Sequence, residues 1–226
     1  MKLQLTIDHG KDFEVLDMVD KLSPVVDVVE IGYPIMVPFG LTLVQEIRRR
    51  NPDVTLYADI KLFHGGTGVV GRCFDMGADV VSVLSAAPDP VIAKAVAQAH
   101  DRGGQIACNL TCPPTRVGER TAQVDELGVD YVIAVSGYIP AYDYDLESHR
   151  GPRLFEPKVR PLDIAATAKR NLRRAKLGIS TGINESNIRD VVALGPELVL
   201  VGRGILDADD RREAALRLKR YMPFEG

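Results

Sequence analysis

An eightfold alternation of short apolar runs with longer amphipathic segments constrains the fold of this chain most strongly. The apolar runs are rich in β-branched residues, which is typical of strands buried on both faces. Hydrophobic residues in the intervening segments recur with helical period. The expected strands cover residues 3–7, 25–31, 54–60, 79–84, 105–110, 130–135, 175–179 and 197–201. The expected helices cover residues 12–22, 39–50, 67–76, 89–102, 116–127, 161–174, 185–194 and 208–221.

Eight strand–helix units in 226 residues favour an α/β fold of one kind, the (β/α)8 TIM barrel. A doubly wound open sheet is the alternative, but no Gly-x-Gly-x-x-Gly follows the first expected strand. No linker divides the chain, so we expect a single barrel domain over residues 1–226. One long irregular insertion, at about 138–160, follows the sixth expected strand, and such a loop is usually functional or mobile.

Composition argues against several classes of partner. A net charge of −3 and a pI near 5.8 disfavour nucleic-acid binding, which relies on a concentrated basic surface. No apolar run approaches the length of a membrane span, and the N-terminus becomes charged too early for a signal peptide. The three cysteines are odd in number and lack a Cys-x-x-Cys spacing, which disfavours a disulfide framework. We therefore expect a cytoplasmic protein with no membrane or nucleic-acid partner.

The third expected strand runs directly into Asp59 and Lys61. Residues two apart on a strand face the same side, so both charges are expected to project together at the mouth of the barrel. A carboxylate beside the ammonium keeps Lys61 protonated, and a fixed cation stabilises negative charge that develops on a substrate oxygen. The alternative is a purely structural ion pair at a strand end.

A second acid, Glu30, ends the neighbouring strand. Glu30 and Asp59 together have the donor chemistry of a Mg²⁺ site, because Mg²⁺ takes one or two carboxylates and completes its octahedron with waters and substrate oxygens. Such an ion would polarise a substrate carbonyl. The alternative is that Glu30 pairs with Lys61 and binds no metal.

Glycine-rich turns follow the last two expected strands, where barrels of this type commonly bind phosphate. Glycines permit close approach of a ligand to backbone N–H groups, and an arginine can hold an anion through its planar guanidinium. The alternative is that both turns are ordinary helix caps. The expected phosphate-binding residues are Ser180, Thr181, Gly182, Gly202, Arg203 and Gly204.

These residues resemble the orotidine-monophosphate-decarboxylase suprafamily, particularly its sugar-phosphate branch of 3-hexulose-6-phosphate synthases and 3-keto-L-gulonate-6-phosphate decarboxylases. The likeness covers nearly the whole chain. Glu30 stands where the orotidylate decarboxylases carry a lysine, which favours the sugar-phosphate branch. The motifs that carry the resemblance are Leu5–Asp8, Asp27–Gly32 with Pro34, Ala58–Lys61, Gly77–Asp79, Leu127–Tyr131 and Val201–Arg203.

The resemblance implies a homodimer of barrels and a Mg²⁺ ion held by Glu30 and Asp59. It also implies that Lys61 lies near an enediolate oxygen and that Asp8 belongs to the same polar cluster. The phosphate of the substrate is then expected near Gly182, Arg203 and Gly204.

Three positions depart from the family pattern. His64 replaces the second acid of the Asp-x-Lys-x-x-Asp motif, Ser136 replaces a proton-donating histidine, and Asn109 ends the fifth strand in place of an acid. Imidazole titrates near neutral pH, so our hypothesis is that His64 or His9 supplies the general acid or base.

The sequence therefore predicts a Mg²⁺-dependent carbon–carbon lyase, an aldolase, synthase or decarboxylase acting on a phosphorylated ketose or keto-acid sugar through a metal-bound enediolate. It does not distinguish aldol chemistry from decarboxylation, because the proton-transfer residues are the ones that are altered. Two alternatives stay open, a sugar-phosphate epimerase or isomerase that uses the same enediolate, and a barrel that only binds a sugar phosphate.

Overall fold

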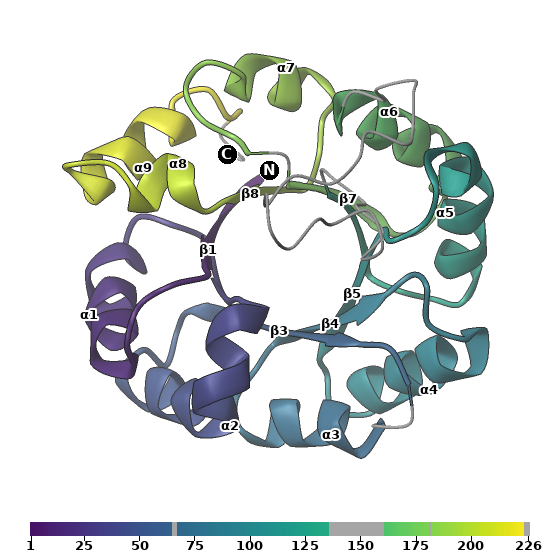
Figure 1. Ribbon diagram of the computed structural model, residues 1–226, viewed down its shortest axis with the longest axis horizontal. Coiled ribbons are helices and arrows are strands. Elements are labelled where there is room, and N and C mark those ends of the chain that lie inside the picture. The colour runs from purple at the N-terminus through teal and green to yellow at the C-terminus, as the bar shows by residue number, and fades with distance from the viewer. Residues whose placement is uncertain (65–66, 136–160, 181, 224–226) are drawn as a thin grey trace, which may run out of the picture.

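A computed structural model describes residues 1–64, 67–135, 161–180 and 182–223 and shows a closed barrel of eight parallel strands (Figure 1). The strands follow one another around the barrel in chain order, and β8 pairs with β1 to close it. The expected (β/α)8 TIM barrel is confirmed. Its strands are β1 (Lys2–Ile7), β2 (Val28–Ile31), β3 (Thr55–Leu62), β4 (Val80–Leu84), β5 (Gln105–Asn109), β6 (Tyr131–Val135), β7 (Lys176–Ser180) and β8 (Leu198–Val201).

The helices surround the strands as an outer layer (Figure 1). Among the described residues, no helix combines the length and apolarity needed to span a bilayer. The expected insertion at 138–160, with Ser136, lies outside the described residues. The helices are α1 (Asp12–Leu22), α2 (Tyr33–Arg50), α3 (Thr67–Asp75), α4 (Asp89–His100), a 3₁₀ turn η1 (Pro114–Arg116), α5 (Val117–Glu126), α6 (Pro161–Asn171), α7 (Ile188–Ala193), α8 (Arg203–Leu206) and α9 (Arg211–Lys219).

Most observed boundaries lie within three residues of the expected ones, and two differences near the mouth of the barrel are larger. Helix α2 begins at Tyr33 instead of residue 39. Pro34 is compatible with a first helical turn, and Gly40, at φ 64°, kinks the chain between two helical parts. The turn after β8 is also not an open glycine loop, because the short helix α8 begins at Arg203 directly after Gly202.

Acidic residues at the opposite end of the barrel serve the fold. Three aspartates stand immediately before β2, β4 and β6, and the carboxylate of each accepts the backbone N–H near the start of the preceding strand. These bonds satisfy buried N–H groups at the strand ends. All three of these acids belong to motifs that resemble the family, so part of the resemblance reflects the scaffold. The bonds run from Leu3 to Asp27 at 2.8 Å, from Leu56 to Asp79 at 2.7 Å and from Ile106 to Asp130 at 2.8 Å.

The end of β3 is irregular. Ala58 pairs with Val81, but the next pairing joins Leu62 to Val83, so the β3 side of the ladder contains extra residues. Within this bulge Lys61 has φ 47°, and no other non-glycine residue in the described ranges has a positive φ. Such backbone is rare for a long side chain and persists only where its surroundings impose it. The bulge therefore re-aims the chain where the expected catalytic lysine lies.

Candidate active site

Asp59 is the most firmly held residue at the mouth of the barrel. Its side chain is buried and receives donors from three different elements. The Ser82 hydroxyl donates to Oδ1 at 2.6 Å, and the backbone N–H of Tyr33 donates to Oδ2 at 3.2 Å. The ammonium of Lys61 forms an ion pair with Oδ2. These contacts fix the orientation of the carboxylate.

Lys61 reaches from this buried carboxylate toward solvent. Its ammonium lies 5.7 Å from the ring centre of Tyr33, within cation–π range, and its side chain is 40% exposed. The expected pairing of Lys61 with Asp59 is present. The expected reason was wrong, because a left-handed residue in a bulge, and not plain strand alternation, brings the two charges together.

Glu30 is buried on β2 and is held by two side chains of β1. Gln4 Nε2 donates to its carboxylate at 2.6 Å, and the Thr6 hydroxyl donates at 2.7 Å. Burial, and then the charge of Asp59, raise the pKa of Glu30 to about 8 although both hydrogen bonds lower it. Among the described residues no ion pair joins Glu30 to Lys61, so the alternative in which these two side chains pair is not observed.

Asp8 completes a group of interacting charges. Loss of surrounding water, and then the charge of Asp59, raise the pKa of its carboxyl, whereas Lys61 and His9 lower it. Gly32 allows this approach, since a Cβ atom there would collide with Asp8 Oδ1. Asp8, Glu30, Asp59 and Lys61 are called the acid–lysine cluster below.

The donor set of this cluster fits a hard divalent cation. Glu30 and Asp59 lie on paired strands, both are buried, and each charge disfavours the other, so a cation between them would relieve the repulsion. No group of three or more His, Cys, Asp or Glu side chains with metal-site geometry occurs in the described ranges. A bound Mg²⁺ would therefore need waters or substrate oxygens to complete its coordination.

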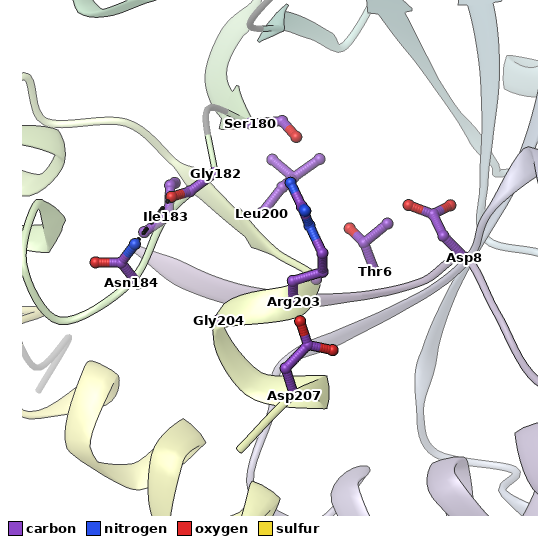
Figure 2. Close-up of a pocket in the computed structure, with 11 residues that line it drawn as sticks. Thr6, Asp8, Ser180, Gly182, Ile183, Asn184, Leu200, Arg203, Gly204 and Asp207 are labelled. Carbon is purple, nitrogen blue, oxygen red and sulfur yellow. Dashed lines mark hydrogen bonds between the residues drawn. The ribbon is translucent and has the colours of Figure 1, made fainter. Parts of the chain in front are cut away.

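A cavity of about 320 Å³ opens beside the cluster, at the ends of β7, β8 and β1 (Figure 2). It is called the Arg203 pocket below. Thr6 and Asp8 lie on one side of Arg203 in Figure 2, and Gly182 and Asn184 lie on the other. Thr181 lies outside the described residues. The expected phosphate-binding residues that line the pocket are Ser180, Gly182, Gly202, Arg203 and Gly204.

Charge in the Arg203 pocket is mixed. The guanidinium of Arg203 forms no hydrogen bond or ion pair with the described residues, so it is free to meet an anion. Asp8 and Asp207 bring two carboxylates to the same lining. Attraction for a phosphate group must then come from Arg203 together with backbone N–H groups. Gly204 suits such a close-packed backbone, because a Cβ atom there would collide with the carbonyl of Ile183.

Thr6 connects the two parts of the site. It lines the Arg203 pocket and donates its hydroxyl to Glu30 at 2.7 Å. A ligand in the pocket is thus one side chain away from Glu30, and it meets the acid–lysine cluster directly at Asp8.

The two histidine hypotheses stay predictions. His64 is exposed directly after β3, with its ring edge-on to Phe63 at 6.1 Å between centroids, and it does not line the Arg203 pocket. His9 is also exposed, and its charge lowers the pKa of Asp8, so it lies near the cluster.

Sequence reasoning missed the supporting partners Gln4, Thr6 and Ser82. All three are polar residues on strands that the sequence predicted correctly. A usable signal was present in β1, where Gln4 and Thr6 alternate with apolar residues that face the helices. In a strand covered on both faces, polar residues at alternate positions point to a polar interior.

A closed barrel that gathers buried acids, a lysine and a glycine-lined pocket at the C-terminal ends of its strands is a (β/α)8-barrel enzyme. The model of the Orotidine 5'-phosphate decarboxylase / HUMPS family matches residues 1–139. The chain belongs to this family and is a lyase.

Similar proteins support the assignment. The chain is 34% identical to the 3-hexulose-6-phosphate synthase of Staphylococcus haemolyticus over 95% of both chains. The solved 3-hexulose-6-phosphate synthase of Salmonella typhimurium superposes with a TM-score of 0.85 at 26% identity, over 98% of both chains. KGPDC from Streptococcus mutans superposes with a TM-score of 0.79 at 20% identity, over 97% of this chain and 96% of the other, and shows a shared fold.

Replacing Glu30 with Gln should stabilise the metal-free protein. The folded state keeps a proton on Glu30 up to about pH 8, whereas an unfolded glutamate loses it near 4.5. Stability from this group is therefore full below 4.5 and is lost as the pH rises to about 8. Gln can still accept from Gln4 and Thr6, so at pH 8 we expect Glu30→Gln to raise the free energy of unfolding by about 1–3 kcal/mol.

Urea unfolding with a chelator present, between pH 5 and pH 8, measures this effect. The gain should grow with pH. Glu126→Gln, at an exposed position of α5, is the matched control and should change little. A loss of stability in Glu30→Gln at pH 8 would contradict the account of a buried, unneutralised carboxylate.

Proposed function

We propose that this enzyme is a Mg²⁺-dependent aldol lyase that cleaves and forms 3-hexulose 6-phosphate, as a 3-hexulose-6-phosphate synthase does. One observation carries the proposal: the Lys61–Asp59 pair and buried Glu30 adjoin, through Thr6, a pocket whose arginine has no partner among the described residues. Relatives named for this activity cover 95% of the chain. The named decarboxylase neighbours are under 25% identical and support the fold alone.

The chemistry follows from the carbonyl at C3 of a 3-hexulose. Aldol cleavage on the C1 side removes the proton of the C1 hydroxyl and breaks the C1–C2 bond. The electron pair of that bond moves toward the C3 carbonyl and leaves an enediolate. C1 departs as formaldehyde, and protonation at C2 gives a five-carbon ketose phosphate. The reverse direction forms the same bond from the same two products.

Each part of the site has a role in this proposal. Lys61, fixed by Asp59, stabilises the negative charge on the enediolate oxygen. Arg203 and the backbone of Gly182 and Gly204 hold the phosphate. Mg²⁺, held by Glu30 and Asp59, would supply Lewis acidity toward the carbonyl oxygen. His64 is proposed as the proton carrier.

We also propose a homodimer that covers this side of the barrel mouth. Large hydrophobic side chains are exposed on consecutive elements after β1, β2 and β3. Exposed patches of this kind mark interfaces, and Tyr33 links the patch to the site because its backbone N–H donates to Asp59. The exposed residues are Phe13, Tyr33, Val37, Phe63 and Val69.

The central prediction is that the purified protein releases formaldehyde from 3-hexulose 6-phosphate. A chelator should abolish release and Mg²⁺ should restore it. Lys61→Met should lower kcat by about 10²–10³-fold, because it removes the cation that meets the developing charge. Lys94→Met, at an exposed position of α4, is the control and should retain wild-type rates. Full activity with a chelator, or in Lys61→Met, would contradict the mechanism.

Replacing His64 with Asn should lower kcat by about 10²–10⁴-fold, the usual contribution of a general acid or base. Binding of inorganic phosphate, measured by calorimetry, should be unchanged because His64 does not line the Arg203 pocket. The matched control is His100→Asn, since His100 pairs with Asp130 at the opposite end of the barrel. A near wild-type rate in His64→Asn would contradict the proposal and show that another group carries the proton.

Val37→Asp should convert the dimer to a monomer, because it places a charge in the exposed apolar patch. Sedimentation velocity of the wild type and the variant gives the measurement. Ala93→Asp, on an exposed position of α4, should remain dimeric. A monomeric wild type at micromolar concentration would refute the proposed assembly.

A further inference from the structure

Gln4 is a polar residue inside the barrel for which the proposed reaction has no role. It lies on β1 and is fully buried. In the strand register it stands beside Val28 of β2 and Leu200 of β8, two members of the apolar cluster of the barrel interior. An amide in such a layer is costly unless its polar atoms are hydrogen-bonded, so a glutamine at this position needs a physical reason.

Only one end of the Gln4 amide has a partner among the described residues. Nε2 donates at 2.6 Å to Oε2 of Glu30, which lies on the neighbouring strand one layer nearer the mouth. Oε1 is buried and has no hydrogen-bond partner. An apolar side chain of the same length would avoid an unpaired oxygen in this layer, so packing alone does not account for the glutamine. What distinguishes Gln4 from such a side chain is the N–H that it gives to Glu30.

Both side chains that donate to Glu30 meet the same oxygen. Thr6 Oγ1 donates to Oε2 at 2.7 Å, beside the bond from Gln4 Nε2. Gln4 and Thr6 are two apart on β1, so they face the barrel interior from one rigid strand. Oε1 of Glu30 accepts no hydrogen bond from the described residues. The two donors therefore fix the direction of the carboxylate and leave one of its oxygens for another partner.

Asp59, the second acid of the proposed metal site, is arranged differently. Its Oδ1 accepts from Ser82, and its Oδ2 accepts from the backbone N–H of Tyr33 and pairs with Lys61. Both oxygens of Asp59 are thus engaged with the protein. Within the described part of the chain, Glu30 Oε1 is the carboxylate oxygen of this pair that has no competing donor, so a cation depends most on where Glu30 points.

We propose that Gln4 is a positioning residue for the metal site, which with Thr6 occupies Oε2 of Glu30 and so presents Oε1 to a divalent cation. Outer partners of this kind orient a ligand before the metal arrives, and their loss weakens metal binding. The unpaired Oε1 of Gln4 is then the cost of placing an N–H donor in an apolar layer. The inference rests on the proposed function for the presence of the cation, but not for the lyase reaction.

A matched pair of glutamines allows the test. Gln4→Met keeps the length of an unbranched side chain and removes the N–H. Gln105→Met is the control, because Gln105 opens β5 at the other end of the barrel and contacts the Tyr131 hydroxyl there at 3.5 Å. Mn²⁺ favours the same oxygen ligands as Mg²⁺ and serves as the probe in calorimetry. We expect Gln4→Met to raise the dissociation constant for Mn²⁺ by about 10–100-fold and Gln105→Met to leave it unchanged.

Thermal unfolding separates positioning from a role in the fold alone. Met suits the apolar layer, so with a chelator present the midpoint of Gln4→Met should stay within about 4 °C of wild type. Gln4→Leu, with a shorter apolar side chain, repeats both measurements if Gln4→Met does not fold. A role confined to the fold predicts a lower midpoint with wild-type affinity for Mn²⁺, and that result would overturn the proposal. Failure of both variants to fold would overturn it as well.

Kinetics give a further readout on the complete enzyme. In Gln4→Met the Mg²⁺ concentration for half-maximal formaldehyde release should rise by the same factor as the dissociation constant. At saturating Mg²⁺, kcat should return to within about threefold of wild type, and KM for 3-hexulose 6-phosphate should stay within about twofold. A loss of kcat that Mg²⁺ does not restore would place Gln4 in the reaction itself and contradict a role through Glu30.

The calorimetry also distinguishes this inference from the proposed function. If the wild type binds Mn²⁺ but has no lyase activity, and Gln4→Met still weakens Mn²⁺ binding, the function fails and the positioning role stands. Unchanged Mn²⁺ affinity in Gln4→Met refutes the role whatever the activity. A wild type that binds no Mn²⁺ refutes both the role and the proposed metal dependence.

Discussion

The burial of two carboxylates at one end of an apolar barrel is the constraint on which the site depends. Glu30 and Asp59 are both buried, and each charge is costly in the presence of the other. The two carboxylates have different hydrogen-bond partners. Among the described residues, Asp59 receives an ammonium, a hydroxyl and a backbone N–H, whereas Glu30 receives two neutral donors and has a raised pKa. The charge of Asp59 is thus balanced within the protein, whereas the charge of Glu30 requires a proton or a bound cation to neutralise it.

The left-handed backbone at Lys61 is a second consequence. A strained non-glycine residue costs about 1–3 kcal/mol and persists when the surroundings over-determine it. Here the ion pair with Asp59, the ring of Tyr33 and the hydroxyl of Ser82 act on the same residue from three elements. A regular β3 would continue the ladder with β4 and give Lys61 a different direction. The bulge interrupts the regular pairing of β3 with β4 and fixes the ammonium of Lys61 at the mouth of the barrel.

The barrel could be predicted because burial on both faces makes each strand a continuous apolar run, which is visible without tertiary information. The start of α2 could not, because Pro38 and Gly40 interrupt the helical pattern, and the structure places a separate helical part before the kink at Gly40. The residues Glu30, Asp59 and Lys61 were found from their places at strand ends. Their partners were not, since the strand pattern gives the face of a residue but not which polar groups meet across the barrel.

The mixed charges of the Arg203 pocket limit how much binding energy its side chains can supply to a phosphate group. In the part of its lining that the structure describes, two carboxylates meet one guanidinium, so these side chains alone give little net attraction for a phosphate group. Backbone N–H groups add attraction that does not change during a reaction, and such uniform binding lowers KM without raising kcat. In the proposed reaction the acid–lysine cluster differs, because Lys61 would meet charge that exists only as the bond breaks. Asp8 belongs to both regions, so its carboxylate opposes an anion in the pocket while it adds to the negative field that favours a cation in the cluster. In the proposed reaction, phosphate binding would therefore locate the substrate, and the buried acids with their cations would account for most of the rate.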